Sequence, residues 1–163
     1  MNKKGFTLIE LLAVIVLIGI VGIIVVPSVL DDLKVSKNKS YEILVNNIKV
    51  AAENYYQECE YGDLEDIIKK DTTKYGNCTF KRVSDNEHYI ELPLITLANT
   101  GFLTVSEVDE SNNKVILDPR DKTNNMNECT IKIIKKTDNG KVTYTVAAST
   151  GENCPTTDEY QGE

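Results

Sequence analysis

The chain begins with an apolar stretch that decides its organisation: residues 5–30 read GFTLIELLAVIVLIGIVGIIVVPSVL. Between Phe6 and Val26 the only charged side chain is that of Glu10. A helix needs about 20 apolar residues to cross a bilayer core, so this segment predicts a transmembrane helix. A secretory signal peptide fits less well, because its apolar core is about 7–15 residues long and ends at a small-residue cleavage site.

The charges that flank this segment predict its orientation. Lys3 and Lys4 precede it, and Asp31 and Asp32 follow it. Basic flanks stay on the cytoplasmic side of a membrane, so we expect a cytoplasmic N-terminus and an extracytoplasmic remainder. Glu10 is the exception inside the segment, because an ionised carboxylate there costs about 2.5–3.5 kcal/mol on insertion scales. This charge therefore needs a partner.

The stretch Lys3-Lys4-Gly5-Phe6-Thr7-Leu8-Ile9-Glu10-Leu11-Leu12, with Gly19 and Pro27 behind it, resembles the type IV pilin and type II secretion pseudopilin family. The resemblance implies that residues 1–5 are a leader peptide. A membrane-bound prepilin peptidase would cleave between Gly5 and Phe6 and N-methylate Phe6. The product would be a structural subunit of a filament and not an enzyme.

The resemblance also explains the charge of Glu10. The carboxylate can reach the Phe6 ammonium of a neighbouring subunit, and opposite charges attract more strongly at low dielectric than in water. Methylation keeps the ammonium charged while it adds apolar surface. We therefore expect Phe6 and Glu10 to direct assembly and to set the stagger between subunits.

The expected partners follow from the same resemblance. They are copies of this chain and other pilins in a helical filament, the prepilin peptidase, an assembly platform protein and a cytoplasmic ATPase. The chain would be a single-pass membrane precursor first and a cell-surface filament afterwards. Whether it is a major or minor subunit stays open, as does the use of the filament in adhesion, motility, DNA uptake or secretion. The alternative is a monomeric membrane-anchored extracytoplasmic binding domain, which needs neither the Gly5–Phe6 junction nor Glu10.

Three residues predict a weak point in the first part of the helix. Pro27 removes a backbone hydrogen bond and clashes with the preceding turn, and Gly19 and Gly22 lower helix propensity. We therefore expect a kink or a local loosening. The resemblance implies that the segment from Gly19 to Pro27 is helical in the membrane and partly melted in the filament. Residues 6–30 are thus predicted as the transmembrane and assembly helix.

The remaining chain, residues 31–163, is predicted as an extracytoplasmic pilin head that includes an amphipathic half of the long helix, about 31–58. Apolar residues recur there at spacings of three and four, as on one face of a helix. They are Leu30, Leu33, Tyr41, Leu44, Val45, Ile48, Ala51, Ala52 and Tyr55. The helix is expected from about Phe6 to Gln57.

The sequence after this helix predicts a small antiparallel sheet. Turn residues and alternating patterns predict strands at Cys78–Val83, His88–Leu92, Lys114–Leu117, Thr130–Lys135 and Lys141–Val146, short helices near Asp63–Ile68 and from Pro93 to Gly101, and a loose tail after Cys154. A long N-terminal helix packed on such a sheet is an α+β, pilin-like fold.

Four cysteines, Cys59, Cys78, Cys129 and Cys154, lie on the predicted outer side of the membrane. An even number in an exported domain indicates disulfides, and four cysteines allow three connectivities. Their positions favour Cys59 with Cys78, which ties down the connection after the helix, and Cys129 with Cys154, which fastens the tail to the sheet. Free thiols are expected only in a reducing compartment.

Composition narrows the possible functions. The chain of 163 residues suits one domain plus an anchor, and its net charge of −7 argues against direct nucleic-acid binding. A single histidine and the absence of a CxxC pair or a phosphate-binding loop leave no cofactor to predict. Calcium is a remaining candidate, because Asp118, Asp121 and Glu128 offer carboxylate oxygens, which calcium prefers. The alternative is an ordinary solvated acidic loop.

Overall fold

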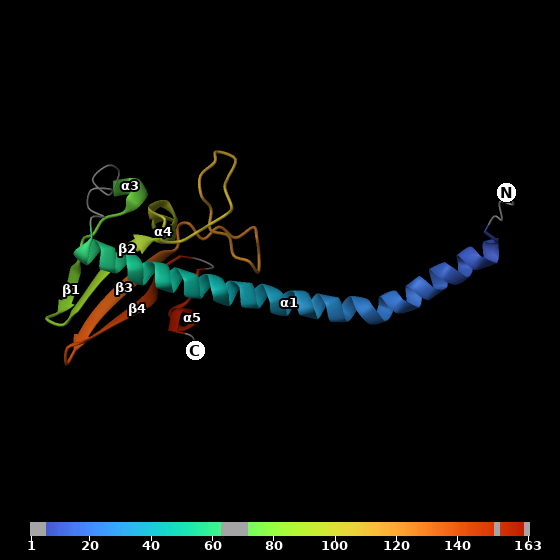
Figure 1. The fold of residues 1–163 in the computed structure, drawn as a ribbon, viewed down its shortest axis with the longest axis horizontal. Helices are drawn as coiled ribbons and strands as arrows, with labels where there is room; N and C mark the ends of the chain where they lie inside the picture. Colours follow the sequence, from blue (N-terminus) through green and yellow to red (C-terminus); the bar gives the residue numbers. More distant parts are fainter. Residues whose placement is uncertain (1–5, 63–71, 152–153, 162–163) are drawn as a thin grey trace. The chain divides into compact units, whose positions relative to one another are not determined.

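The computed structural model describes residues 6–62, 72–151 and 154–161 (Figure 1). It contains two units, Met1–Lys39 and Ser40–Glu163, and we call the second unit the head. The first helix, α1, spans Leu8–Tyr61 and contributes to both. Each unit is described separately below.

The first unit contains the apolar part of α1. Its large side chains are exposed from Leu8 to Leu33, and α1 is the one helix among the described residues that is long and apolar enough to cross a membrane. The helix continues through Pro27, and next to it the Ser28 hydroxyl donates a hydrogen bond to the carbonyl of Val25 at 2.8 Å. Melting of this stretch in a filament stays a prediction.

The part of α1 in the head buries one face, as the spacing of apolar residues predicts. The buried residues are Tyr41, Val45, Ile48, Ala51, Ala52, Tyr55, Tyr56 and Cys59. The spacing also places Leu30 and Leu33 on this face, but they are 54% and 52% exposed and belong to the first unit. The helix also ends at Tyr61, four residues beyond the predicted end at Gln57.

The head contains a four-stranded antiparallel sheet of order β1-β2-β3-β4. The strands are β1 Lys81–Ser84, β2 Glu87–Pro93, β3 Thr130–Asp138 and β4 Lys141–Thr150. In the middle of the sheet, Ile90 pairs with Ile133, which pairs with Val146, and all three are fully buried in the core that α1 shares. The predicted α+β fold is therefore confirmed.

The β3–β4 hairpin has the turn that its sequence predicts. Asn139 and Gly140 adopt positive φ angles of 49° and 80°, and Asp138 pairs with Lys141 across them. Two central residues with positive φ match the right-handed twist of the strands, and Asn-Gly is the preferred pair for such a turn. The short helix α4, Leu94–Thr100, is also confirmed, with Gly101 at φ 89° as its C-cap.

The predicted strand Lys114–Leu117 is wrong. This segment makes only the isolated bridges Val108–Lys114 and Leu117–Asn125. A side chain takes the place of a neighbouring strand: the Ile116 amide donates to Asn127 Oδ1 at 2.8 Å, and Asn127 Nδ2 donates to the Lys114 carbonyl at 3.1 Å. The backbone groups are thus satisfied without a ladder.

The expectation of a loose tail is also wrong. The tail forms helix α5, Thr157–Gln161, in which Tyr160 is only 2% exposed. Thr156 and Glu159 cap its start, since the Thr156 amide donates to Glu159 Oε2 at 2.6 Å and the Glu159 amide donates to Thr156 Oγ1 at 3.3 Å. This Thr-x-x-Glu capping box is readable in the sequence.

Two other predictions concern the connection after α1. The helix expected near Asp63–Ile68 lies outside the described residues, which resume with the short helix α3 at Thr72–Tyr75. The strand expected from Cys78 begins only at Lys81.

Tyr160 provides a test of the head's core. Its hydroxyl is buried and, among the described residues, has no hydrogen-bond partner. Tyr160→Phe should therefore leave the free energy of unfolding unchanged or raise it by about 1 kcal/mol, whereas Tyr160→Ala should lower it by about 3–5 kcal/mol. Urea unfolding of the full chain in detergent, followed by tyrosine circular dichroism, measures both. Equal losses in the two variants would show that the hydroxyl is satisfied, for example by a buried water.

Candidate functional site

The start of α1 holds the carboxylate of Glu10 by hydrogen bonds from Thr7. The Thr7 amide donates to Glu10 Oε2 at 2.8 Å, and the Thr7 hydroxyl donates to the same oxygen at 2.7 Å. In return the Glu10 amide donates to Thr7 Oγ1 at 3.4 Å. This reciprocal arrangement is a capping box, with Thr7 before the first turn and Glu10 inside it.

The capping box shows that Glu10 has a partner within its own chain. Sequence reasoning missed this role of Thr7, although the Thr-x-x-Glu spacing signals it. A carboxylate can accept about four hydrogen bonds, so Glu10 keeps capacity for a further donor. Phe6, the predicted new N-terminus, is 83% exposed, and Gly5 lies outside the described residues.

Gly19 and Gly22 have open surroundings. A methyl group added at either position would meet nothing within 4 Å outside the local helix backbone. Packing within this chain therefore does not require glycine at these two positions. Their predicted role in weakening the helix stays a prediction.

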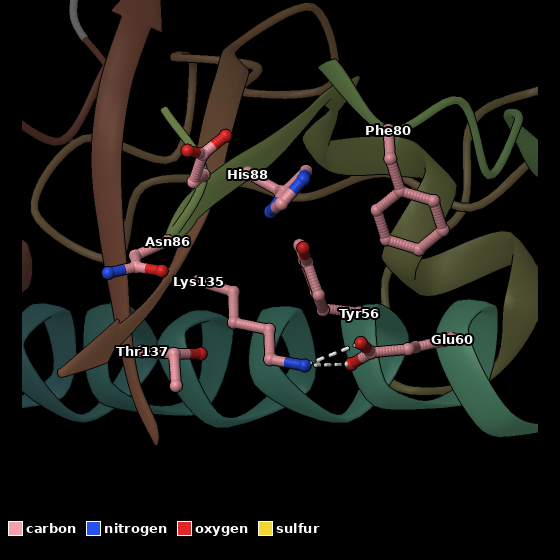
Figure 2. Close-up of a pocket in the computed structure, with 8 residues that line it drawn as sticks. Tyr56, Glu60, Phe80, Asn86, His88, Lys135 and Thr137 are labelled. Atoms are coloured by element: carbon pink, nitrogen blue, oxygen red, sulfur yellow. Dashed lines mark hydrogen bonds and ion pairs between the residues drawn. The ribbon is translucent and has the colours of Figure 1, made fainter. Parts of the chain in front are cut away.

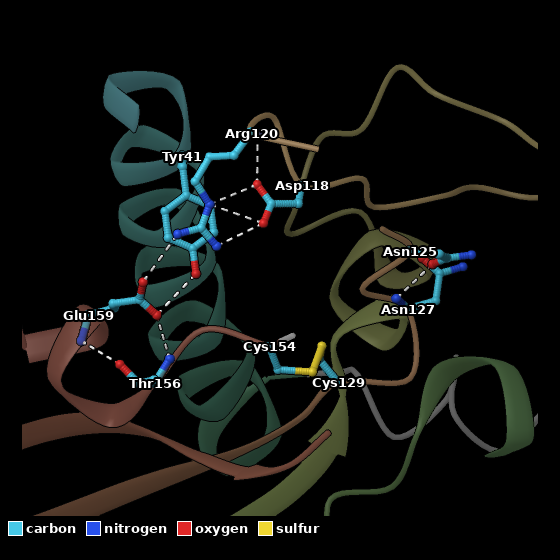
Figure 3. The surroundings of a disulfide bond; sticks show 9 residues. All are labelled: Tyr41, Asp118, Arg120, Asn125, Asn127, Cys129, Cys154, Thr156 and Glu159. Atoms are coloured by element: carbon cyan, nitrogen blue, oxygen red, sulfur yellow. Dashed lines mark hydrogen bonds and ion pairs between the residues drawn. A yellow bond between two sulfur atoms is a disulfide. The ribbon is translucent and has the colours of Figure 1, made fainter. Parts of the chain in front are cut away.

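The structure brings the four cysteines together in the two pairs that the sequence favours. Cys59 in the last turn of α1 is bonded to Cys78, with their Cα atoms 5.3 Å apart. Cys129, next to β3, is bonded to Cys154, with a Cα separation of 5.7 Å (Figure 3). Each bond closes a loop and limits the conformational freedom of the unfolded chain.

A charged cluster around Arg120 joins three segments of the head (Figure 3). The guanidinium contacts Asp118 through Nη2 at 2.8 Å and Glu159 of α5 through Nη1 at 3.6 Å. It also stacks on Tyr41 of α1, with Cζ 3.3 Å from the ring centroid. The Tyr41 hydroxyl in turn donates to Glu159 Oε2 at 3.0 Å.

This cluster determines the protonation of Asp118. Burial by itself would raise the pKa of Asp118, because it disfavours the charged form. The hydrogen bonds from the Arg120 side chain and backbone outweigh burial and hold the pKa below its usual value. Asp118 is therefore a buried carboxylate that stays ionised.

Two of the three calcium candidates lie at the same hollow of the head. Asp118, Arg120 and Asp121 line one hollow, and Glu128 is not among the residues that line it. The Asp118 carboxylate forms an ion pair with the Arg120 guanidinium. Asp121 accepts hydrogen bonds from the Thr123 amide and hydroxyl at 3.0 Å and 2.7 Å. Within the described residues no group of three metal-ligating side chains comes together. Calcium binding stays an untested prediction.

A second polar cluster lies where the end of α1 meets the sheet (Figure 2). Lys135 of β3 donates to Glu60 of α1 at 2.5 Å and 2.7 Å. Burial works to lower the pKa of Lys135, but the hydrogen bonds that Lys135 donates to Glu60 and Tyr61 outweigh it and raise the pKa. The pair borders a hollow of about 410 Å³ that Tyr56 and His88 also line. In the described structure the Glu60–Lys135 ion pair joins α1 to β3.

The Arg120 cluster gives a prediction with a definite pH dependence. Arg120→Met should lower the free energy of unfolding by about 2 kcal/mol at pH 7, because it leaves the buried Asp118 carboxylate without its cation. The loss is smaller than for a fully buried pair since the Arg120 side chain is 39% exposed.

The sign of the pH effect follows from the pKa of Asp118. In the wild type the depressed pKa stabilises the head above about pH 4, the pKa of an unfolded aspartate. In Arg120→Met burial raises the pKa of Asp118. Protonation of Asp118 then removes the cost of burying an unpaired charge. The difference in the free energy of unfolding between wild type and Arg120→Met should therefore become smaller as the pH falls from 7 to 4. Urea unfolding measures this difference, and a value that does not change with pH would contradict the prediction.

The comparison with known families concerns the N-terminal segment. Residues 1–26 match the family model described as the prokaryotic N-terminal methylation motif. No curated protein and no solved structure matches the chain significantly. The motif covers Gly5, Phe6, Thr7 and Glu10, and it indicates a structural protein that starts as a membrane-anchored precursor. The chain therefore carries the N-terminal signature of type IV pilins and pseudopilins.

Proposed function

We propose that this chain is the precursor of a structural subunit in a type IV pilus-like filament. The observation that carries the proposal is the methylation motif over residues 1–26, with Glu10 inside an otherwise apolar and exposed helix. Cleavage between Gly5 and Phe6 places a new ammonium group four residues before this carboxylate.

The energetics of membrane exit support a role for Glu10 in assembly. Lipid tails are as apolar as leucine, so moving the first unit from lipid into a filament gains little from hydrophobic contact alone. A pair of opposite charges at low dielectric can make the filament a more favourable environment than the lipid. In the precursor the Glu10 carboxylate accepts hydrogen bonds from Thr7. In the filament it would also form an ion pair with the Phe6 ammonium of a neighbouring subunit.

The head fits an extracytoplasmic destination. Both of its disulfides need an oxidising compartment, and Lys3 and Lys4 keep the N-terminus in the cytoplasm. A membrane platform protein and a cytoplasmic ATPase would extract the processed chain into a surface filament. The ATPase would supply the energy for extraction, and this sequence itself contains no phosphate-binding loop.

Mass spectrometry of the mature protein tests the proposal. We expect a chain that starts at Phe6 and carries an N-methyl group. An intact chain that starts at Met1 would favour the membrane-anchored binding domain instead. Electron microscopy of cells with and without the gene then tests whether the processed chain is in filaments.

Gly5 should control processing. Gly5→Leu is expected to block cleavage, because the peptidase has to fit a small residue beside the scissile bond. Gly5→Ala is the matched control and should still be cleaved, more slowly than the wild type. Immunoblotting for the shorter mature chain measures both variants. Mature chain starting at Phe6 in the Gly5→Leu strain would contradict the prediction.

Glu10 should be needed for assembly but not for insertion. Glu10→Val removes a carboxylate that costs about 2.5–3.5 kcal/mol in the membrane, so the precursor should insert at least as well as the wild type. It also leaves the neighbour's ammonium unpaired, at about 3–5 kcal/mol for a buried charge, so filaments should be lost.

A Thr7→Val variant separates assembly from helix capping. It removes the side-chain hydrogen bonds of the capping box and keeps the Glu10 carboxylate, and it should still form filaments. Sheared filaments and membrane fractions are measured in cells whose only copy of this subunit is the variant. Wild-type filament yield with Glu10→Val would rule out the proposed pairing.

A further inference from the structure

A tyrosine hydroxyl without a described partner lies at the hollow beside the Glu60–Lys135 pair. Tyr56 of α1 is only 1% exposed, and it lines this hollow of about 410 Å³, which we call the Tyr56 hollow. Figure 2 shows the hydroxyl directed from α1 into the space near His88. Among the described residues no group forms a hydrogen bond with it. A buried tyrosine usually brings its hydroxyl to a partner, so this group points to a bound molecule in the hollow.

Three further polar side chains line the Tyr56 hollow from the sheet, those of Asn86, His88 and Thr137. His88 pairs with Lys135 of β3, and the Thr137 amide donates to the Asn86 carbonyl at 2.8 Å. Residues two apart on a strand face the same side of a sheet, so Lys135 and Thr137 project together. In the part of the chain that the structure describes, the side chains of Asn86, His88 and Thr137 form no hydrogen bond or ion pair.

The charged groups of the Tyr56 hollow already have partners. Lys135 donates to the two Glu60 oxygens at 2.5 Å and 2.7 Å, and Asp85 forms an ion pair with Arg82. The lining therefore has no excess of positive charge to hold an anion, and each of its two carboxylates already has a cation. A charged ligand would lose its hydration there without gaining a counter-charge. The hollow favours a neutral ligand.

Phe80 gives the Tyr56 hollow an apolar wall. It is 38% exposed, and its ring meets that of Tyr56 edge to face, with the centroids 5.1 Å apart. A wholly apolar ligand would cover Tyr56, Asn86 and Thr137 and leave their polar groups unsatisfied, which costs free energy. The ligand therefore needs one apolar face and several groups that both donate and accept hydrogen bonds.

A sugar ring has both properties. Each of its hydroxyls donates and accepts hydrogen bonds, which matches the hydroxyls of Tyr56 and Thr137 and the side-chain amide of Asn86. The C–H groups on its faces are apolar and can pack against an aromatic ring. The volume of the hollow lies within the range of about 300–1,000 Å³ for small-ligand sites. A peptide strand is bound mainly through its backbone at a free sheet edge, whereas these side chains lie on a sheet face.

We propose that the Tyr56 hollow binds a neutral sugar residue. In the complex Phe80 contacts a C–H face of the sugar ring. Tyr56, Asn86 and Thr137 form hydrogen bonds with its hydroxyls, and His88 borders the ligand from β2. The inference goes beyond the proposed function and does not depend on filament assembly.

The purified full chain, in a detergent whose headgroup is not a sugar, tests the proposal. His88 is the one histidine of the chain, so protein with isotope-labelled histidine gives the NMR signals of a single imidazole, which lies at the hollow. Glucose, galactose and N-acetylglucosamine are titrated separately at constant pH. We expect at least one of them to shift the His88 signals in a saturable way.

Two variants test whether the hydroxyls bind the sugar. Tyr56→Phe keeps the ring that packs on Phe80, and Thr137→Val keeps the shape of a β-branched side chain. Each should weaken the affinity about three- to tenfold, because it removes one hydrogen bond to the ligand. Tyr55→Phe is the matched control, since the Tyr55 hydroxyl donates to the Tyr75 carbonyl at 3.3 Å and Tyr55 does not line the hollow. Its affinity should equal that of the wild type.

Three results would overturn the proposal. The first is a wild type whose His88 signals respond to none of the three sugars. The second is an affinity that is unchanged in both Tyr56→Phe and Thr137→Val, or lowered equally in Tyr55→Phe. The third is a stronger response to inorganic phosphate or to a tetra-alanine peptide than to any sugar, which would assign the hollow to an anion or to a peptide.

Discussion

The buried face of α1 from Tyr41 to Cys59 is the contact on which the head depends. The sheet's central residues, such as Ile90 and Ile133, are fully buried and belong to the same core cluster as this helix face. Burying a large apolar side chain stabilises a fold by about 1.5–3 kcal/mol, so the tyrosines, Val45 and Ile48 on this face make a large contribution to the stability of the head. At the far end of the contact, the Glu60–Lys135 pair fixes where α1 meets β3.

The C-terminal segment completes the head through several kinds of interaction at one place. Cys154 is bonded to Cys129, Glu159 contacts Arg120, and Tyr160 is buried in the core. An acidic tail would otherwise be solvated, and one buried tyrosine could not order it against the loss of chain entropy. The disulfide and the charged cluster reduce this entropic cost. Because the disulfide is a covalent bond, it attaches the C-terminal segment to the head without the help of other proteins.

The first unit follows a different rule from the head. Among the described residues its large apolar side chains are exposed, which suits a surrounding of lipid. Between Phe6 and Val26 the one charged side chain is that of Glu10, for which lipid is a poor environment, and Thr7 satisfies part of its hydrogen-bonding capacity. The apolar part of this helix is therefore compatible with a membrane-anchored precursor.

The sequence by itself determined the features that depend on local pattern. Spacing or backbone preference within a few residues indicated the apolar segment, the buried face from Tyr41 onward and the Asn139-Gly140 turn. The methylation motif around Gly5 and Glu10 was readable through its resemblance to a known family. Only the tertiary structure decided how distant segments satisfy one another. Asn127 replaces a strand beside Lys114, and Arg120 joins α1 to α5, because such contacts link residues far apart in the chain and leave no periodic signal in it.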